Sequence, residues 1–250
     1  ARLGVDKFKD GKGTRWALVD GQPLIGVTTA LSVVVPKSLR DYWLSTTPNK
    51  AEVTLTNAGN NGTIFHNMLE AHWHGTPYKE TTKAQHRVLF ANFQRWITKF
   101  DKAVPVEVEA DAIDSSMLYA GTGDLVIDVT EHGITRRELW DYKTSRQYSI
   151  KTGWQLAAYL KALNKREPYL TTPIVGMRGI HCSYSTGEIT DFEYVHIDFC
   201  YKAFLASLSA FIALEFNNMS KYGIKLPDGT KYRYSVETLS NLMEAIICQK

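Results

Sequence analysis

Two β-rich segments near the middle of this 250-residue chain constrain its fold more than any other stretch. The first, Asp124–Val129, reads D-L-V-I-D-V, and the second, Arg137–Lys143, reads R-E-L-W-D-Y-K. The polar pair His132-Gly133 between them predicts a tight turn, so the two segments are expected to form a β-hairpin. Alternate residues of a strand share a face, and therefore Asp141 and Lys143 point into one space.

The same hairpin is expected to bring two carboxylates beside that lysine. Asp124 begins the first strand, where pairing places its side chain near Asp141, whereas Asp128 on the same face lies nearer the turn. Two carboxylates and a converging lysine can hold a hard divalent cation with a water molecule beside it. A cross-strand salt bridge explains the same residues. The hairpin alone leaves both interpretations open.

The composition is that of an ordinary globular protein, with 44% hydrophobic and 22% charged residues. The longest apolar runs, such as 31–36 and 204–214, are too short or too interrupted for a membrane span, and the polar first residues predict no signal peptide. A net charge of +3 permits nucleic-acid binding without requiring it. Three cysteines without C-x-x-C spacing exclude a four-cysteine metal site and predict buried thiols in a reducing compartment.

Hydrophobic periodicity and turn residues predict the other elements. Helices are expected at 31–35, 38–45, 63–74, 83–100, 152–163, 201–222 and 236–248, hairpins at 15–27 and 174–197, and strands throughout 104–143. Residues 46–62 are rich in Thr, Asn and Gly and predict a flexible crossing. Helices around a central antiparallel-to-mixed sheet make an α/β fold. We expect one domain over 1–250, with a core at about 60–200, an N-terminal lobe at 1–60 and C-terminal helices at 201–250.

Three local expectations accompany these elements. Thr28 or Thr29 is expected to cap the helix at 31–35. Trp43 is expected to face inward with Leu39 and Tyr42 on the next helix. The segment V-E-V-E-A-D-A-I at 106–113 alternates strictly. This pattern predicts one face with Val106, Val108 and Ala110 and the opposite face with Glu107, Glu109 and Asp111.

The helix at 63–74 carries His66 and Glu70 four residues apart, so the two side chains lie on one face. Apolar neighbours on both sides predict that this face is buried or lines a cleft. A histidine in such a place is more often packed or hydrogen-bonded than bound to a metal. His72 and His74 lack the H-E-x-x-H order of a zinc site and are expected at the surface.

Gln155 and Tyr159 have the same spacing on the helix at 152–163, where the edge of a buried face is an ordinary explanation for them. The motifs form an ordered series: G-T-x-x-H-x-x-x-E, a strand glutamate at Glu109, G-x-x-D, D-Y-K-T-S and Q-x-x-x-Y. The series resembles the PD-(D/E)XK nuclease superfamily, specifically its RecB-like branch of mitochondrial genome maintenance and phage recombination exonucleases. The resemblance covers about 66–163, and L-I-G-V-T-T-A-L-S at 24–32 is similar to the N-terminal signature of that branch.

The resemblance implies a restriction-endonuclease-like core, a central mixed sheet flanked by helices, and a role for each motif residue. Asp124 and Asp141 resemble metal-binding carboxylates, with His66 and the Tyr142 backbone carbonyl as further ligands. Lys143 resembles the lysine that positions or deprotonates the attacking water and offsets transition-state charge. By the same resemblance, Glu109 either contacts the ligands of the first metal or binds a second metal, and Glu70 accompanies His66. Gln155 and Tyr159 match the last motif of the series.

The implied cofactor is one or two Mg²⁺ or Mn²⁺ ions, and the implied products carry 5′-phosphate and 3′-hydroxyl groups. The imidazole of His66 shifts the preference modestly towards Mn²⁺. Asp141 stands where many relatives have Glu, which shortens its reach slightly. The four-cysteine cluster of the iron–sulfur members of this branch is missing from the sequence, so no iron–sulfur cluster is expected.

Cationic and aromatic side chains near the motifs are candidates for DNA contacts, although for any one of them a solvated or packed role is the favoured explanation. Arg146, Tyr148 and Lys151, after the second strand of the hairpin, are the strongest candidates. The others are Lys37, Arg40, Lys79, Lys83 and Arg87 for phosphates, and Tyr42 and Trp43 for stacking.

The sequence therefore predicts a metal-dependent DNA exonuclease that processes ends or flaps in recombination, repair or replication. A phage or other mobile element is the expected origin. Linear single-stranded or duplex DNA ends are the expected partner, with a single-strand-binding or annealing protein as a further possibility, no membrane, and a cytoplasmic or, alternatively, mitochondrial location. A structure-specific endonuclease and a catalytically idle DNA-binding subunit are the alternatives. Intact Asp124, Asp141 and Lys143 argue against the idle subunit.

Overall fold

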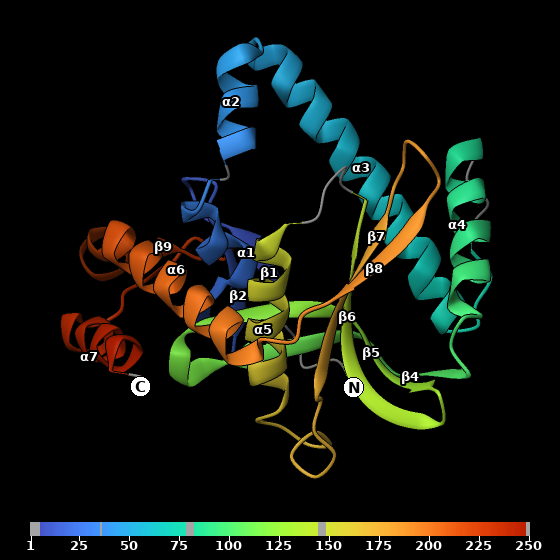
Figure 1. Ribbon diagram of the computed structural model, residues 1–250. Helices are drawn as coiled ribbons and strands as arrows, with labels where there is room; N and C mark the ends of the chain where they lie inside the picture. Colours follow the sequence, from blue (N-terminus) through green and yellow to red (C-terminus); the bar gives the residue numbers. More distant parts are fainter. Residues whose placement is uncertain (1–5, 36, 79–82, 145–148, 249–250) are drawn as a thin grey trace.

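A mixed eight-stranded sheet forms the centre of the computed structural model, which describes residues 6–35, 37–78, 83–144 and 149–248 (Figure 1). Its strand order is β1-β2-β3-β5-β6-β7-β8, with β4 also paired to β5. The elements are β1 (Asp6–Lys9), β2 (Arg15–Val19), β3 (Gln22–Gly26), α1 (Val27–Ala30), a 3₁₀ turn (Leu31–Val33), α2 (Lys37–Ser45), α3 (Pro48–Trp73), α4 (Ala84–Ile97), β4 (Lys102–Asp114), a 3₁₀ turn (Ser115–Met117), β5 (Tyr119–Glu131), β6 (Ile134–Lys143), α5 (Ile150–Leu163), β7 (Gly176–Cys182), β8 (Ile189–Glu193), α6 (Ile197–Asn217), a π-helical turn (Asn218–Tyr222), β9 (Ile224–Lys225), β10 (Lys231–Tyr232) and α7 (Val236–Ile247).

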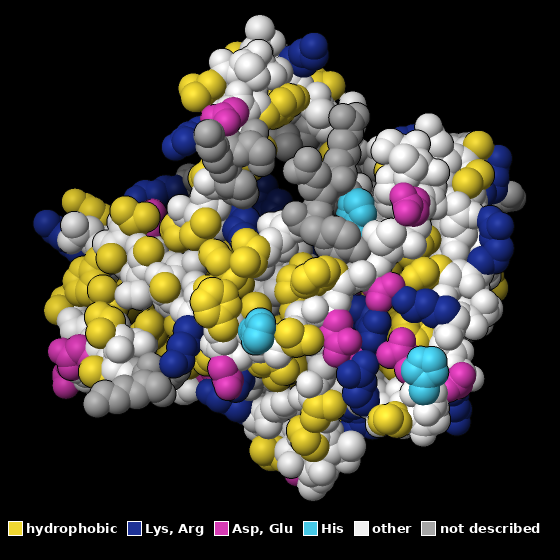
Figure 2. Space-filling model, in the orientation of Figure 1, with side chains coloured by type: hydrophobic (Ala, Val, Ile, Leu, Met, Phe, Trp, Pro, Cys, Tyr) yellow, Lys and Arg dark blue, Asp and Glu magenta, His cyan; other side chains and the backbone are white. Residues whose placement is uncertain are grey.

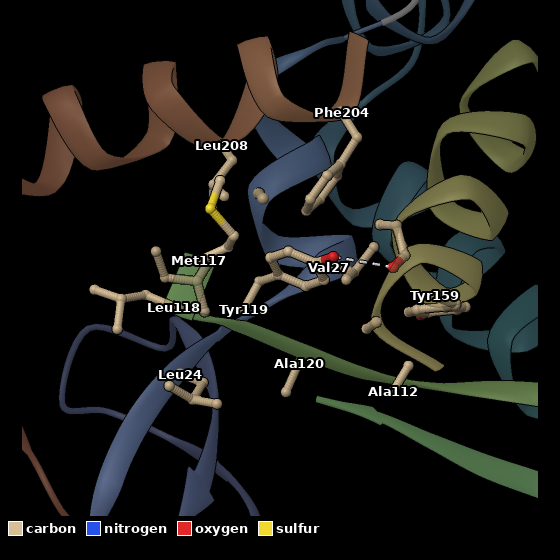
Figure 3. Packing of buried hydrophobic residues seen from close by; sticks show 14 of the residues in the cluster. Leu24, Val27, Ala112, Met117, Leu118, Tyr119, Ala120, Tyr159, Phe204 and Leu208 are labelled. Atoms are coloured by element: carbon tan, nitrogen blue, oxygen red, sulfur yellow. Dashed lines mark hydrogen bonds between the residues drawn. The ribbon is translucent and has the colours of Figure 1, made fainter. Parts of the chain in front are cut away.

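Helices cover both faces of this sheet, which confirms the predicted α/β class (Figure 1). On one face α1, α5 and α6 pack on the N-terminal strands and β5, where Tyr119 and Phe204 meet edge to face at 4.9 Å between ring centroids (Figure 3). On the other face α3 and α4 pack on β5, β6 and β7 through Phe65 and Phe93, both fully buried. The hairpin is therefore sandwiched between two apolar layers.

The predicted hairpin is β5 and β6, which pair antiparallel around His132 (φ 52°) and Gly133 (φ 77°). Their register runs from Glu131↔Ile134 at the turn to Leu125↔Trp140. Beyond that pair the strands separate, because β6 continues alongside β7 while the start of β5 pairs in parallel with β3. The sheet therefore forks at Asp124.

The segment predicted to be a flexible crossing is instead the first half of α3, so that prediction was wrong. Pro48 stands at the helix start, where its missing N–H costs nothing. Two hydroxyls bond carbonyls one turn back, Thr54 to Lys50 and Thr63 to Gly59, so these polar side chains are satisfied within the helix. With α2, this half of α3 projects away from the sheet as an arm (Figure 1).

Several side-chain predictions were also wrong. The first helix begins after Gly26, so Thr28 and Thr29 lie inside it rather than at its cap, and the Thr29 hydroxyl donates to the Arg15 carbonyl at 3.0 Å. Trp43 does not face inward, since 45% of it is exposed on the projecting arm. The strict alternation at 106–113 is broken by a shift of register between Pro105 and Glu107, which is a β-bulge.

Two surface expectations changed as well. His72 packs edge-on against Phe90 and Phe93 instead of lying free at the surface, whereas His74 is exposed as predicted. The thiols of Cys182 and Cys200 are buried as expected, and Cys248 is exposed.

Within the described residues one helix, Ile197–Tyr222, is long and apolar enough to cross a membrane, with a mean hydropathy of 1.6 in its most apolar window. The sequence predicted a helix at 201–222 but no membrane span there. The buried helix of a folded core has the same composition, and 44% of this window is buried inside the protein. Figure 2 shows hydrophobic side chains gathered over α6 on the visible face, while charged side chains of both signs alternate over the neighbouring strands.

Candidate active site

Asp124 lies where β5 and β6 separate. Beyond this point the backbone N–H groups of β6 have no backbone partner on β5, and both strands lie wholly within the described residues. Asp124 Oδ2 accepts the Tyr142 backbone N–H at 2.7 Å, so the side chain replaces the absent strand partner. Its Oδ1 lies 3.5 Å from His66 Nδ1. Burial would raise the pKa of Asp124, but the His66 and Lys143 charges and the Tyr142 N–H together lower it below its ordinary value. The carboxylate is therefore ionised at the centre of the site.

Asp141 and Lys143 share a face of β6, as their spacing predicts. Lys143 Nζ lies 2.6 Å from Asp141 Oδ2, and Gln155 Nε2 on α5 donates to Asp141 Oδ1 at 3.0 Å. Asp141 is only 1% exposed, and this burial, with the Asp124 charge, raises its pKa to about 6 although Lys143 opposes the rise. Oδ2 is buried, and the Lys143 ammonium is its charged partner.

His66 reaches the fork from α3 on the opposite face of the sheet. Its Nε2 lies 2.9 Å from the Tyr142 carbonyl oxygen while Nδ1 faces Asp124, so a protonated ring donates to both acceptors. Burial would lower the pKa of His66, but the Asp124 and Asp141 charges outweigh it and raise the pKa to about 9. The Tyr142 ring lies on this same face, edge-on to the His66 ring at 6.0 Å between centroids, and its hydroxyl accepts from the Trp73 indole at 2.9 Å.

Gln155 and Tyr159 form the pair that their spacing predicts. Gln155 Nε2 donates to the Tyr159 hydroxyl at 3.2 Å as well as to Asp141. The buried Tyr159 ring lies against Gly121 of β5, where an added Cβ would come within 2.3 Å of the ring. Gly121 of the G-x-x-D motif is therefore required for close packing, and the packing holds Gln155 beside Asp141.

Glu109 of β4 adopts φ 54° and feels the charges of Asp124 and His66. Burial, together with the charges of Asp124 and Glu70, raises its pKa to about 7, whereas Lys7 of β1 opposes the rise. Glu70 also lies 4.0 Å from His74 Nε2. Glu109 therefore lies within the electrostatic reach of both Asp124 and Glu70.

The donor set at the fork suits a hard divalent ion: two carboxylates, the Tyr142 carbonyl and one imidazole. The buried Oδ2 of Asp141, which faces the Lys143 ammonium, is a carboxylate oxygen of the kind such an ion binds. In the described part of the chain no three His, Cys, Asp or Glu side chains are grouped closely enough to hold a metal. Instead, His66 and Lys143 supply the positive charge that a divalent ion would supply.

The predicted DNA contacts include residues bonded within the protein, exposed residues and residues that lie outside what the structure describes. Lys151 Nζ donates to the carbonyls of Val34 at 2.9 Å and Leu31 at 3.4 Å, so it ties α5 to the N-terminal lobe. Burial lowers its pKa. Arg40 is exposed on the projecting arm. Arg146, Tyr148, Lys79 and the side chain of Lys37 lie outside the described residues.

Sequence reasoning missed a cationic pocket beside the fork. This cavity of about 500 Å³ has Gly121, Thr122 and Tyr159 in its wall, and residues of the N-terminal strands and α1 complete it: Lys7, Phe8, Lys9, Arg15, Trp16, Ala17, Gly26, Val27, Thr28 and Thr29. The signal was the L-I-G-V-T-T-A-L-S motif, because its strand pairs with β5 at Ile25↔Tyr119. We refer to this cavity as the first compartment.

A central mixed sheet flanked by helices makes this an α/β protein with a restriction-endonuclease-like core, and its fork carries the buried Asp141, the partly buried Asp124, a lysine and a glutamine. Residues 77–184 match the family model of the PD-(D/E)XK nuclease superfamily, whose members typically use divalent metals. The matched segment contains Glu109, Asp124, Asp141, Lys143, Gln155 and Tyr159, and it ends after β7. His66 precedes it. No curated protein matches the chain.

Proposed function

We propose that this chain is a metal-dependent DNA exonuclease of the RecB-like branch, which hydrolyses phosphodiester bonds at DNA ends or flaps and leaves 5′-phosphates. One observation carries the proposal: Asp124 and Asp141 meet at the fork with Lys143 Nζ 2.6 Å from the buried Asp141 Oδ2. A plain structural salt bridge would not need a glutamine donor on the second Asp141 oxygen or a histidine facing Asp124 from another helix.

A phosphodiester is an anion that repels hydroxide, so its hydrolysis near neutral pH requires positive charge at the reacting phosphate. Asp124, Asp141, the Tyr142 carbonyl and His66 would hold one or two Mg²⁺ or Mn²⁺ ions. The bound ion would act as a Lewis acid and lower the pKa of water. Every other contribution comes from the side chains around it.

Lys143 contributes as a cation in this arrangement. Burial would lower its pKa, but the Asp141 and Asp124 charges outweigh burial and raise the pKa above its ordinary value. The ammonium therefore stays protonated near pH 7, where it orients the attacking water and offsets charge on the phosphate, rather than removing a proton. Gln155 keeps Asp141 Oδ1 in place while Oδ2 faces the lysine.

The first compartment supports a DNA strand as the substrate. Lys7, Lys9 and Arg15 place positive charge beside the Tyr159 wall, and Tyr159 is linked through Gln155 to Asp141. A strand bound with a phosphate in this compartment would run next to the carboxylates. Trp43, exposed on the projecting arm, is available to stack on an unpaired base.

The deciding experiment compares linear single-stranded, linear duplex and closed circular DNA, each incubated with Mg²⁺ or Mn²⁺ and with chelator. We expect metal-dependent loss of both linear forms from their labelled ends while circles persist. Rapid cutting of closed circles would favour a structure-specific endonuclease on the same site. No cutting of any form, by a protein that still binds DNA, would favour an idle binding subunit.

A further inference from the structure

A second cavity continues the first compartment away from the fork. It has a volume of about 560 Å³ and shares three residues with the first compartment: Arg15, Thr28 and Thr29. Its remaining lining comes from the β1–β2 loop, the end of the first helical turn and α6: Lys12, Gly13, Thr14, Ser32, Val33, Phe211, Leu214 and Glu215. The two cavities therefore adjoin at Arg15, Thr28 and Thr29. We call the second cavity the second compartment and the two compartments together the groove.

Hydrogen bonds to one buried side chain fix the β1–β2 loop that borders the second compartment. Asp10, only 9% exposed, accepts the backbone N–H of Lys12 at 2.9 Å and of Thr14 at 3.0 Å. Its other oxygen accepts the Trp16 indole N–H at 3.0 Å, and Trp16 lines the first compartment. Gly13 adopts φ 82°, which allows the tight turn. One buried carboxylate thus fixes the loop that carries exposed Lys12 and couples it to the neighbouring compartment.

The second compartment joins cationic and apolar surfaces in the way a nucleotide requires. Lys12 and Arg15 stand on its loop side, and Glu215 is its only acidic lining residue among those described. Leu214 of α6 lies across from them with 74% of its surface exposed, beside buried Phe211. An exposed leucine and two cations in one cavity suit a base and its phosphates better than they suit a small inorganic ion.

We propose that the groove carries one strand of the substrate past the scissile bond, from the fork through the first compartment and over Arg15 into the second. This inference rests on the proposed nuclease function and deepens it. The strand on this side is then not limited to a single terminal nucleotide. The end that is cut off occupies this groove, so each cleavage releases a short oligonucleotide, and the preference for long strands depends on Lys12 and Leu214.

The test uses Lys12→Glu and Leu214→Glu, which place negative charge in the second compartment at exposed positions. Ile247→Glu, at a residue of α7 that is 73% exposed, is the matched control. Each protein is assayed with Mn²⁺ on a single-stranded 20-mer and on a nitrophenyl ester of thymidine monophosphate, which fills the fork alone. We expect both groove variants to lower kcat/KM on the 20-mer about tenfold, with the small ester hydrolysed as by wild type and the control.

Product length gives a second readout. Wild type is expected to release oligonucleotides, and the groove variants are expected to shift the ladder towards shorter products. Two results would overturn the groove proposal while an active wild type leaves the nuclease function standing. The first is an unchanged rate on the 20-mer in both groove variants, and the second is a wild type that releases only mononucleotides. A wild type that hydrolyses neither substrate would overturn the proposed function, and the groove proposal with it.

Discussion

Replacement of His66 by Gln tests the charge pattern at the fork. In the metal-free protein the pKa of His66 is raised from 6.5 to about 9, because the charges of Asp124 and Asp141 outweigh burial. A histidine whose folded-state pKa exceeds its unfolded value stabilises the fold fully below pH 6.5 and loses that contribution as the pH rises through 9. His66→Gln should therefore destabilise the protein at pH 6 and much less at pH 10.

The magnitude follows from the two pKa values. A rise from 6.5 to about 9 corresponds to about 3 kcal/mol, at roughly 1.4 kcal/mol for each pH unit. Because 29% of the His66 side chain is exposed, solvent screens part of the interaction. We expect the loss in unfolding free energy to be about 2 kcal/mol larger at pH 6 than at pH 10. Lost packing adds a penalty that is the same at both pH values.

Urea unfolding in the presence of chelator, followed by tryptophan fluorescence and circular dichroism, measures this difference. His74→Gln is the matched control, because His74 is an exposed residue of the same chain region, 4.0 Å from Glu70. It should lose less than about 0.5 kcal/mol at either pH. An equal loss for His66→Gln at pH 6 and pH 10 would refute the charge pattern that we assign to the fork.

Three further predictions concern packing, positioning and metal binding. Gly121→Ala brings a Cβ within 2.3 Å of the Tyr159 ring and should lower both the melting temperature and the rate of DNA hydrolysis. Gly59→Ala, with open space around it, should instead stabilise α3 by about 0.5–1 kcal/mol. The reverse order of stabilities would contradict the packing of Tyr159 on Gly121. Gln155→Ala removes the hydrogen bond to Asp141 Oδ1 and should lower the hydrolysis rate about 10–100-fold with little change in the free energy of unfolding. An unchanged rate would exclude a positioning role for Gln155. Calorimetric titration with Mn²⁺ at pH 7.5, in buffers of different ionisation enthalpy, should show about one proton released by wild type and none by His66→Gln, because a ligating imidazole must lose its proton; no release by wild type would exclude His66 as a ligand.

The hairpin and the Asp141–Lys143 pair were predictable because they depend on local geometry. Two-residue strand periodicity puts both side chains on one face whatever surrounds them, and a polar residue followed by glycine marks the turn. The pairing of Gln155 with Tyr159 follows from helical spacing in the same way.

The first half of α3 was not predictable from propensity. Its Thr, Asn and Gly residues are weak helix formers, and the helix extends into them from the buried turn that contains Phe65. The cationic groove was missed for another reason. It depends on the parallel pairing of β3 with β5 at Ile25↔Tyr119, which joins residues far apart in the sequence. No local pattern specifies that pairing, so Lys7 and Arg15 looked like ordinary surface cations.

The most direct test of the central claim is the rate of hydrolysis of end-labelled linear DNA by wild type, Asp141→Ala and Lys143→Ala in Mg²⁺ or Mn²⁺. Circular dichroism and urea unfolding establish that each variant folds. We predict metal-dependent hydrolysis by wild type and a loss of about 1,000-fold or more in both variants, because each removes charge or a ligand at the reacting phosphate. Folded variants that hydrolyse DNA at the wild-type rate would contradict a nuclease site at the fork.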